Sequence, residues 1–316
     1  MTSWGYTLSS EEHPPGDLVR FAQRAEGAGF DFLSISDHFH PWIDEQGHSP
    51  FVWSVLGAVA HATKEVRIGT GVTCPIVRTP PVIVAHAAAT VSLLSGGRFF
   101  LGVGSGEALN EHVMGQHWPP IEARHEMLVE ALEIMRELWT GETVDHEGSY
   151  YIVENARLYD APAEPIPVVV SAFGPKAAAV AAAEGDGIWM TAPQEDLLKA
   201  FTKAKGTGPK IGQLTVCWAR TVEEAEETAF RVWPNTALPG QLSQDLPTPT
   251  HFEQACQLVR KEDIAQKVPC GPDPDPVLEK LREYESAGLD HVHIHQIGPD
   301  QDGFLEFWER ELQPKL

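Results

Sequence analysis

The sequence predicts a (β/α)8 barrel of the TIM type, because strand-like and helix-like segments alternate along almost the whole chain and eight segments have the short apolar character of buried strands. The length of 316 residues suits such a barrel, which often occupies about 250 residues, together with insertions. A doubly wound parallel sheet is the alternative, since the alternation alone fits both folds. We expect residues 1–316 to form one barrel domain with insertion segments.

The first half of the chain contains four expected strands, each followed by a stretch in which apolar residues recur at helical spacing. In the first helix, for example, Leu18, Phe21 and Ala25 lie on one face. Short apolar runs bounded by glycine or polar residues are typical of buried parallel strands. The expected strands are 4–8, 30–35, 66–72 and 99–103, and the expected helices are 16–29, 52–63, 82–94 and 122–139.

The second half contains four further apolar runs, and all but the last are followed by a helical pattern. The expected strands are 168–172, 187–191, 214–218 and 292–297. Two insertions exceed a minimal barrel. Residues 143–159 have the pattern of a hairpin with a turn at Glu147 and Gly148. Residues 234–271 are rich in Pro, Thr and Gln, with a helix around 252–260, and long insertions of this kind usually form lids or binding loops.

The composition argues against several classes of partner. A net charge of −22 disfavours nucleic acid and anionic membrane surfaces, which both attract clusters of basic residues. The chain has no apolar run of about 18 residues that could span a membrane, and its N-terminus lacks the basic and apolar regions of a signal peptide. We therefore expect a cytoplasmic protein. Its cysteines are scattered, as is typical of buried or unreactive thiols; they are Cys74, Cys217, Cys256 and Cys270.

The most informative motif directly follows the expected strand 30–35. It contains Asp37, His38, His40 and Trp42. An acid can hold a charge, an imidazole exchanges protons near neutral pH, and an indole can stack on a ring. Because the carboxyl ends of barrel strands form the active-site face, this motif predicts a catalytic position.

A glycine-rich turn follows the fourth expected strand. Gly102, Gly104 and Gly106 precede Glu107, which stands where the dinucleotide fingerprint G-x-G-x-x-G requires its last glycine. We expect instead that the glycines let the backbone pass close to a flat ligand, toward which Glu107 points its carboxyl group. A tight turn with an exposed glutamate is the plainer alternative. Gly71 ends the third strand and indicates either a second close approach or a simple bend.

Three histidines alternate along the last expected strand. His291, His293 and His295 project to the same face, where they could bind zinc or serve as core and rim residues. Metal-dependent hydrolases with this fold usually carry His-x-His on the first strand, and residues 4–8 contain none, so we expect no metal. The sequence also lacks the Gly-x-Ser-x-Gly elbow of serine hydrolases.

The segments SDHFHPW (36–42) and LGVGSGEALNE (101–111) resemble the glucose-6-phosphate dehydrogenase group of the luciferase-like, coenzyme F420-dependent oxidoreductases. The resemblance extends nearly from end to end, with further matches at 141–145, 150–151, 174–175, 185–187, 288–291 and 304–305. It implies a (β/α)8 barrel, usually a homodimer, that binds a deazaflavin at the carboxyl ends of its strands and acts on a small molecule.

The resemblance implies roles for particular residues. His38 is the expected base that takes the hydroxyl proton of an alcohol as its hydride leaves for the deazaflavin. Glu107 is expected to deliver a proton, or donate a hydrogen bond, toward N1 of the ring. Trp42 is expected to stabilise positive charge at the oxidised carbon and to exclude water. The expected cofactor-binding residues are Asp37, Gly71, Val72, Gly106, Asn110, Ser171, Ala172, Phe173 and Gly174.

The chain departs from the phosphosugar members of this group where they hold the phosphate. Those members resemble one another in a lysine after the sixth strand, a Lys-His pair in the late insertion and an arginine beyond it. Here residues 191–194 contain no lysine, the pair is Thr250-His251, and Lys267 replaces the arginine. A phosphate held away from water needs several convergent cations, so we predict that glucose-6-phosphate is not the preferred substrate. His251 and Lys267 are the candidate substrate contacts.

Two other functions are compatible with the same motifs. One is an FMN-dependent monooxygenase of the luciferase-like class, in which FMN replaces F420. The other is a non-catalytic carrier or sensor of the deazaflavin. In either case we expect the substrate-facing wall to come from residues 234–271.

Overall fold

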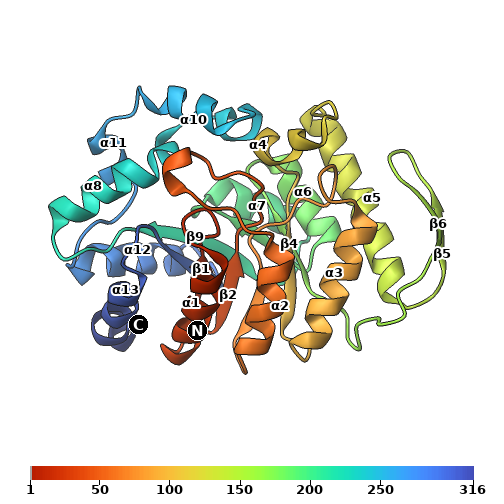
Figure 1. Cartoon of the computed structure of the whole chain (residues 1–316), viewed down its shortest axis with the longest axis horizontal. Coiled ribbons are helices and arrows are strands. Elements are labelled where there is room, and N and C mark those ends of the chain that lie inside the picture. The colour runs from red at the N-terminus through yellow and green to blue at the C-terminus, as the bar shows by residue number, and fades with distance from the viewer. Residues whose placement is uncertain (1) are drawn as a thin grey trace.

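Eight parallel strands close into a barrel in the computed structural model, which describes residues 2–316 (Figure 1). Its last strand pairs with its first, with Ser3 opposite His291 and Tyr6 opposite Ile294. The predicted (β/α)8 barrel is confirmed, and a closed sheet excludes the doubly wound alternative. The barrel strands are β1 (Ser3–Leu8), β2 (Phe32–Ile35), β3 (Arg67–Thr70), β4 (Phe99–Val103), β7 (Val168–Ser171), β8 (Gly187–Met190), β9 (Lys210–Val216) and β10 (His291–Gln296).

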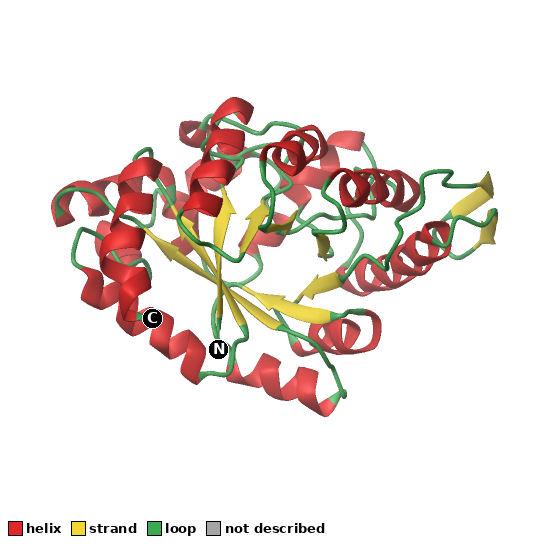
Figure 2. Cartoon of the chain, turned by 90° about the horizontal axis from the view of Figure 1, so that it is seen from below, coloured by secondary structure: helices red, strands yellow, loops and turns green. Residues whose placement is uncertain are grey.

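Helices follow the strands and cover the outside of the barrel (Figure 2). The first begins at Pro15, where a missing backbone N–H costs no hydrogen bond, and carries Asp17 in its first turn. The covering helices are α1 (Pro15–Gly27), α2 (Val52–Ala62), α3 (Pro81–Leu94), α5 (Ile121–Trp139), α6 (Pro175–Glu184), α7 (Glu195–Lys203), α12 (Pro274–Ser286) and α13 (Gln301–Phe307). The sequence pattern did not predict α13, a short helix capped by Asp300 whose apolar side chains are buried.

Apolar and aromatic side chains pack inside the barrel as one cluster, which consists of Phe32, Phe100, Val169, Trp189 and Ile211. His293 lies between Phe32 and Trp189, with ring centroids 4.1 and 4.2 Å away. Its complete burial lowers its pKa, so the imidazole is neutral. Farther along the strands, Gly71 packs against Ser34 and Trp189. The missing side chain of Gly71 thus lets the backbone after β3 approach the Trp189 ring closely.

The first insertion is a two-stranded antiparallel hairpin that projects from the body of the molecule, as Figure 2 shows. It consists of β5 (Val144–Glu147) and β6 (Ile152–Ala156), as predicted. The turn does not begin at Glu147, which is still in the strand, but spans residues 148–151. Glu130 of α5 accepts hydrogen bonds from the backbone N–H groups of residues 149–151 and so determines this longer turn.

The second insertion belongs to a larger lobe, residues 218–269, which leaves the end of β9 and returns beside it (Figure 1). The helix predicted around 252–260 is present as α10 (Pro249–Cys256), which ends earlier than predicted. The lobe also contains helices that were not predicted within the insertion, and its full set is α8 (Val222–Val232), η3 (Pro234–Ala237), α9 (Leu242–Asp245), α10 and α11 (Lys261–Ala265). The break between α10 and α11 coincides with Arg260, whose backbone N–H and side chain bond Asp263 and start a new helix.

Within residues 2–316, none of the helices has both the length and the apolar character needed to cross a membrane.

Candidate active site

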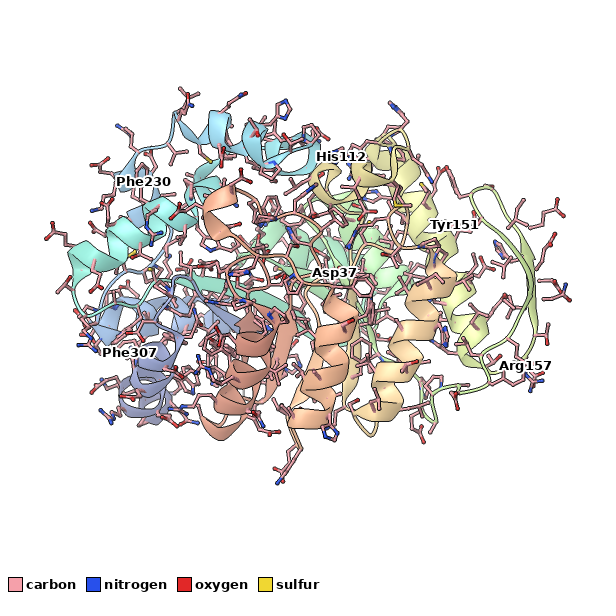
Figure 3. All side chains as sticks on the ribbon, in the orientation of Figure 1. Asp37, His112, Tyr151, Arg157, Phe230 and Phe307 are labelled. Atoms are coloured by element: carbon pink, nitrogen blue, oxygen red, sulfur yellow. The ribbon has the colours of Figure 1, made fainter. Side chains whose placement is uncertain are left out.

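The polar segments that follow β1 to β4 meet at the carboxyl end of the barrel. Figure 3 places Asp37, at the end of β2, near the centre of the molecule. Parallel strands bring their carboxyl ends to one rim, so residues distant in sequence become neighbours there. The predicted motif at 37–42 and the glycine turn at 104–107 thus lie on the same face of the barrel.

His38 pairs with Glu11, which follows β1. The Nε2 atom of His38 lies 3.5 Å from Oε1 of Glu11, and their side chains are only 10% and 4% exposed. The Nδ1 atom of His38 lies 3.1 Å from the carbonyl oxygen of His40. Both ring nitrogens of His38 therefore face oxygen acceptors of the protein.

Glu11 is held in its ionised form by its surroundings. Burial raises the pKa of Glu11, but the charge of His38 and a hydrogen bond from the Ser36 hydroxyl outweigh this effect. The pKa of Glu11 therefore lies below its usual range. An ionised carboxylate beside His38 stabilises the imidazole ring when that ring carries a proton.

Trp42 connects His38 to the lobe. The rings of Trp42 and His38 meet edge to face with centroids 4.9 Å apart. On its other side, Trp42 meets Phe252 of α10 at 5.2 Å, and its backbone N–H donates to Gln46. The indole is half-buried, so it forms a wall shared by the barrel rim and the lobe.

Asp37 belongs to a buried charge network. Its carboxylate accepts hydrogen bonds from Thr73 (2.7 Å) and from Nη2 of Arg78 (2.8 Å). The guanidinium also pairs with Glu111 at 3.5 Å, and the Arg78 backbone N–H donates to that carboxylate. Burial raises the pKa of Glu111 to about 7. Both oxygens of Asp37 thus have protein partners, and a direct contact between Asp37 and a cofactor stays a prediction.

Glycines at the ends of β3 and β4 allow close packing of the backbone. A Cβ atom on Gly71, which is joined to Val72 by a cis peptide bond, would lie 2.9 Å from the Trp189 ring. Gly106 has a φ of +76° and lies against Cys74, so a side chain there would be both strained and crowded. Both residues, and Val72, are half-buried at the barrel mouth.

Glu107 and Asn110 lie in the segment that follows the glycine turn. Glu107 directly precedes the short helix α4 (Ala108–Glu111) and is half-buried. The side-chain oxygen of Asn110 accepts hydrogen bonds from the backbone N–H groups of Phe39 and His40. Its buried Nδ2 atom has no partner within residues 2–316. Asn110 thus fixes the 37–42 motif and has a donor left for a ligand.

The 171–174 segment joins β7 to α6 at the same rim. Ser171 is half-buried at the strand end, and Ala172 is buried, with its N–H donating to the carbonyl of Trp189. Phe173 is 53% exposed, and Gly174 precedes the first turn of α6. The segment therefore presents backbone and an exposed ring beside the barrel mouth.

The two candidate substrate residues lie on the lobe and are exposed. The Nζ atom of Lys267 donates to the carbonyl of Thr236 at 3.0 Å, and Nδ1 of His251 lies 2.6 Å from the Thr248 hydroxyl. Each side chain therefore has a partner within the lobe. Their contact with a substrate remains a prediction.

Glu12 connects the lobe to the barrel through hydrogen bonds. Its carboxylate accepts hydrogen bonds from the Trp233 indole (2.6 Å) and from the Gly298 backbone (2.7 Å). Burial raises the pKa of Glu12 to about 7. Trp233 in turn meets His295 of β10 edge to face at 4.8 Å. Glu12 thus joins the loop after β1, the lobe and the loop after β10.

Sequence reasoning missed Glu11 and Arg78. The sequence contained a pattern that could have indicated Glu11. Polar residues directly after an expected strand mark the active-site face, and residues 9–13 are all polar. Arg78 gave no such signal. It lies 41 residues from Asp37 in the sequence, and only the fold brings them together.

The histidines of β10 have an aromatic environment. No three His, Cys, Asp or Glu side chains within residues 2–316 are placed to hold a metal ion together. Burial lowers the pKa of His295 to about 4, and its Nδ1 lies 3.4 Å from the side-chain nitrogen of Gln213. These histidines pack mainly against aromatic rings.

A closed parallel barrel with a buried acid–imidazole pair at its carboxyl rim is the architecture of a barrel enzyme. The chain belongs to the luciferase-like monooxygenase family, whose model matches residues 2–291. The resemblance found in the sequence motifs is thereby confirmed.

Two relatives and one solved structure are similar over nearly the whole chain. An F420-dependent glucose-6-phosphate dehydrogenase of Segniliparus rotundus is 40% identical, covering 99% of this chain and 97% of the relative. The protein of the same name from Amycolatopsis mediterranei is 36% identical, covering 100% and 99%. An F420-dependent secondary alcohol dehydrogenase, solved in complex with an F420-acetone adduct, has a TM-score of 0.91 at 30% identity, covering 99% of this chain and 98% of that one.

Proposed function

We propose that the protein is an F420-dependent oxidoreductase that transfers a hydride between the deazaflavin and an alcohol or carbonyl carbon of a small substrate. The observation that carries this proposal is the buried His38–Glu11 pair beside Trp42 at the barrel rim. The names of the relatives, which are F420-dependent dehydrogenases of a sugar phosphate and of a secondary alcohol, support the same cofactor and chemistry.

The residues at the barrel mouth fit a flat ring system. Gly71 and Gly106 present bare backbone there, and the buried Nδ2 atom of Asn110 is a donor without a partner in the described chain. The half-buried backbone of 171–174 lies at the same rim. When bound, the deazaflavin supplies a ring carbon that accepts or releases a hydride.

His38 is the proposed general base in the oxidation direction. Its Nε2 atom takes the hydroxyl proton of the substrate, and Glu11 stabilises the resulting imidazolium through their 3.5 Å contact. Nδ1 donates to the carbonyl of His40 and keeps the ring in this orientation. In the reduction direction the same imidazolium returns the proton to the carbonyl oxygen.

Glu107 and Trp42 complete the proposed catalytic set. Glu107, half-buried beside the glycine turn, donates a proton or a hydrogen bond toward the cofactor ring. Trp42 offers its indole to positive charge at the reacting carbon and, with Phe252, keeps water from it. Asp37 acts through its network with Arg78, which fixes the backbone that carries His38.

The proposed substrate is neutral or weakly charged. Residues 191–194 contain no lysine, and the pair in the insertion is Thr250-His251. Lys267, the remaining cation, bonds the lobe's own backbone. Because one such cation cannot replace several convergent ones, a phosphate group would lose more hydration than it gains in contacts.

The proposal is tested by titrating the protein with F420 and following the quenching of cofactor fluorescence. We expect binding with a dissociation constant below the order of 10 μM. A second step follows F420 reduction by neutral secondary alcohols beside glucose-6-phosphate. No binding at that concentration rejects the proposal, and a protein that carries FMN and consumes oxygen favours the monooxygenase. Binding without turnover of any alcohol or ketone favours the carrier.

We further propose a cytoplasmic homodimer that associates through α2 and α3. Neither helix contains Asp, Glu, Lys or Arg, in a chain of which 22% is charged. Ile83 and Leu94 of α3 are 52% and 57% exposed, an arrangement that favours burial against a second copy about a two-fold axis. The free thiols of all four cysteines are typical of a reducing compartment.

Light scattering after gel filtration tests the dimer. We expect the wild-type protein to have twice the mass of one chain and Leu94→Glu to have the mass of a single chain, since a buried unpaired carboxylate is costly. Leu258→Glu, at an 88% exposed position of the lobe, is the matched control and should remain dimeric. A wild-type protein of single-chain mass contradicts this part of the proposal.

A further inference from the structure

Cys217 and Cys270 lie directly opposite each other where the two ends of the lobe meet. They form an isolated parallel bridge just beyond the end of β9. The N–H of Cys217 donates to the carbonyl of Pro269, and the N–H of Gly271 donates to the carbonyl of Cys217, both at 2.9 Å. These two hydrogen bonds fix Cys270 as the residue opposite Cys217.

This pairing gives the two residues the separation that a disulfide requires. Adjacent strands lie about 4.7–4.9 Å apart, and the Cα atoms of disulfide-bonded residues lie about 4.4–6.8 Å apart. Side chains of directly opposed residues also project to the same face of a sheet. Both belong to one apolar cluster, with Cys217 buried and Cys270 half-buried.

In the present state each thiol has its own weak acceptor. Cys217 donates to the carbonyl of Ile297 at 3.6 Å, and Cys270 donates to the carbonyl of Val268 at 3.3 Å. A thiol–carbonyl hydrogen bond is weak, so rotation of each side chain about its Cα–Cβ bond costs little. The chain's remaining cysteines, Cys74 and Cys256, form no such bridge in the described structure.

We propose that Cys217 and Cys270 are a redox-active pair whose oxidation by a hydroperoxide closes a disulfide at the base of the lobe. This site is independent of the proposed function. The two sulfurs would join the beginning and end of the 218–269 segment, which carries Trp233 and the Phe252 ring that contacts Trp42. Oxidation would thus fasten the lobe that forms one wall of the candidate active site (Figure 1).

The reaction balances with hydrogen peroxide as the oxidant. The thiolate of the more accessible Cys270 attacks a peroxide oxygen, which gives a sulfenic acid and hydroxide. The thiolate of Cys217 then attacks the Cys270 sulfur, forms the S–S bond and displaces a second hydroxide. With the two thiol protons, both hydroxides become water, so two thiols and one peroxide give one disulfide and two waters.

The surroundings make this a slow reaction at neutral pH. Burial raises the pKa of Cys270 to about 11 and also raises the pKa of Cys217 above its usual range. Only a small fraction of either thiol is ionised at neutral pH. We therefore expect disulfide formation to accelerate as the pH of the buffer rises.

Thiol counting on the intact, folded protein tests the proposal. The protein is treated with hydrogen peroxide or diamide in mildly alkaline buffer, then denatured and alkylated with N-ethylmaleimide. Mass spectrometry should find two labels instead of four, and a peptide map should contain a Cys217–Cys270 cross-link. Four labels, cysteine sulfonic acids, or a cross-link between two copies would overturn the proposal.

Single serine variants control the assignment. Cys256→Ser should still form the cross-link and carry one label, whereas Cys270→Ser should carry three. Cys270 is half-buried whereas Cys217 is buried, so Cys270→Ser disturbs the apolar core less than Cys217→Ser would. In the wild type, oxidation should also raise the thermal unfolding midpoint in a way that dithiothreitol reverses, because the bond closes a long loop in the unfolded chain. An unchanged midpoint in protein that carries the cross-link would contradict the fastening of the lobe.

Discussion

The rim formed by β1 to β4 and the 218–269 lobe both border the candidate active site, but they differ in the kind of side chain that they bury. At the rim, ionisable side chains are buried and bonded to one another, as Glu11 is to His38 and Arg78 is to both Asp37 and Glu111. The interior of the lobe is an apolar cluster that includes Val232, Trp233, Ile264 and Val268. Its ion pairs, such as Arg260 with Asp263, lie at the surface.

This difference assigns the chemistry to one region and the shape of the pocket to the other. Proton transfer needs charged groups whose positions are fixed by several partners, and the rim provides them. An apolar wall discriminates substrates by fit and by the absence of cations, so it can change without disturbing the proton-transfer groups. The predictions below test whether the two regions separate in this way.

The largest effect is expected from His38→Ala. Removal of the proposed base should lower kcat by about 10²–10⁴. F420 affinity should change little, because all the proposed cofactor contacts except Asp37 lie on other segments. Steady-state turnover and fluorescence titration measure the two quantities, with His146→Ala on the projecting hairpin as the control. Equal losses of turnover and cofactor binding would mean that His38 supports the site and does not transfer the proton.

The next largest effect is expected on the free energy of unfolding when Arg78 is replaced. Arg78→Met leaves Asp37 and Glu111 as buried carboxylates without their cation, which costs about 3–5 kcal/mol in comparable cases. Chemical denaturation should therefore show a large fall in the free energy of unfolding. Arg231→Met, which removes an exposed ion pair with Glu45, should cost less than about 1 kcal/mol. Similar losses in both variants would show that the buried network is not a special feature of the rim.

The same comparison explains what the sequence could and could not predict. Parallel strands buried on both faces appear as continuous apolar runs, so all eight barrel strands were predicted, although β9 begins at Lys210 and not at the predicted residue 214. The lobe was harder, because its helices of four to eight residues are too short to show a period and depend on tertiary contacts. The Phe252 of α10, for example, packs against Ile43 and Leu109, which are far away in the sequence.

The residues of the candidate site also differ in whether the sequence could predict them. His38, Glu107 and Trp42 stand in local motifs directly after expected strands, so pattern and resemblance both pointed to them. Arg78 became visible only through its long-range contact with Asp37, and Glu12 through its contact with Trp233, 221 residues away. No local pattern specifies such partners, since they are selected by the closure of the barrel.

Substrate choice should be changeable without altering the rim formed by β1 to β4. The double variant Gln194→Lys/Thr250→Lys places cations where phosphosugar relatives are expected to carry them. Its kcat/KM for glucose-6-phosphate should rise roughly tenfold or more, since a charge-assisted hydrogen bond contributes about 1.5–3 kcal/mol. The control Gln194→Met/Thr250→Met adds length without charge and should show no gain. A wild-type enzyme that already uses glucose-6-phosphate with a micromolar Michaelis constant would refute the premise.

The smallest effect concerns Glu12, which joins the two regions. Its folded pKa of about 7 lies above the ordinary carboxyl value of 4.5, so the native protein holds a proton that the unfolded chain releases. The stability contributed by Glu12 is therefore complete below about pH 4.5 and is lost as the pH rises through about 7. In Glu12→Gln this loss is absent. The unfolding free energy of the wild type minus that of the variant should thus fall between about pH 5 and pH 8.

Urea denaturation of both proteins across this range provides the measurement. Glu111, whose pKa is also raised to about 7, adds the same slope to both curves and cancels in the difference. Glutamine keeps one acceptor oxygen for the donors of Trp233 and Gly298, so the variant should lose about one hydrogen bond, or 0.5–1.5 kcal/mol, at low pH. Parallel curves would mean that Glu12 stays ionised throughout, and that the contact between rim and lobe does not respond to pH.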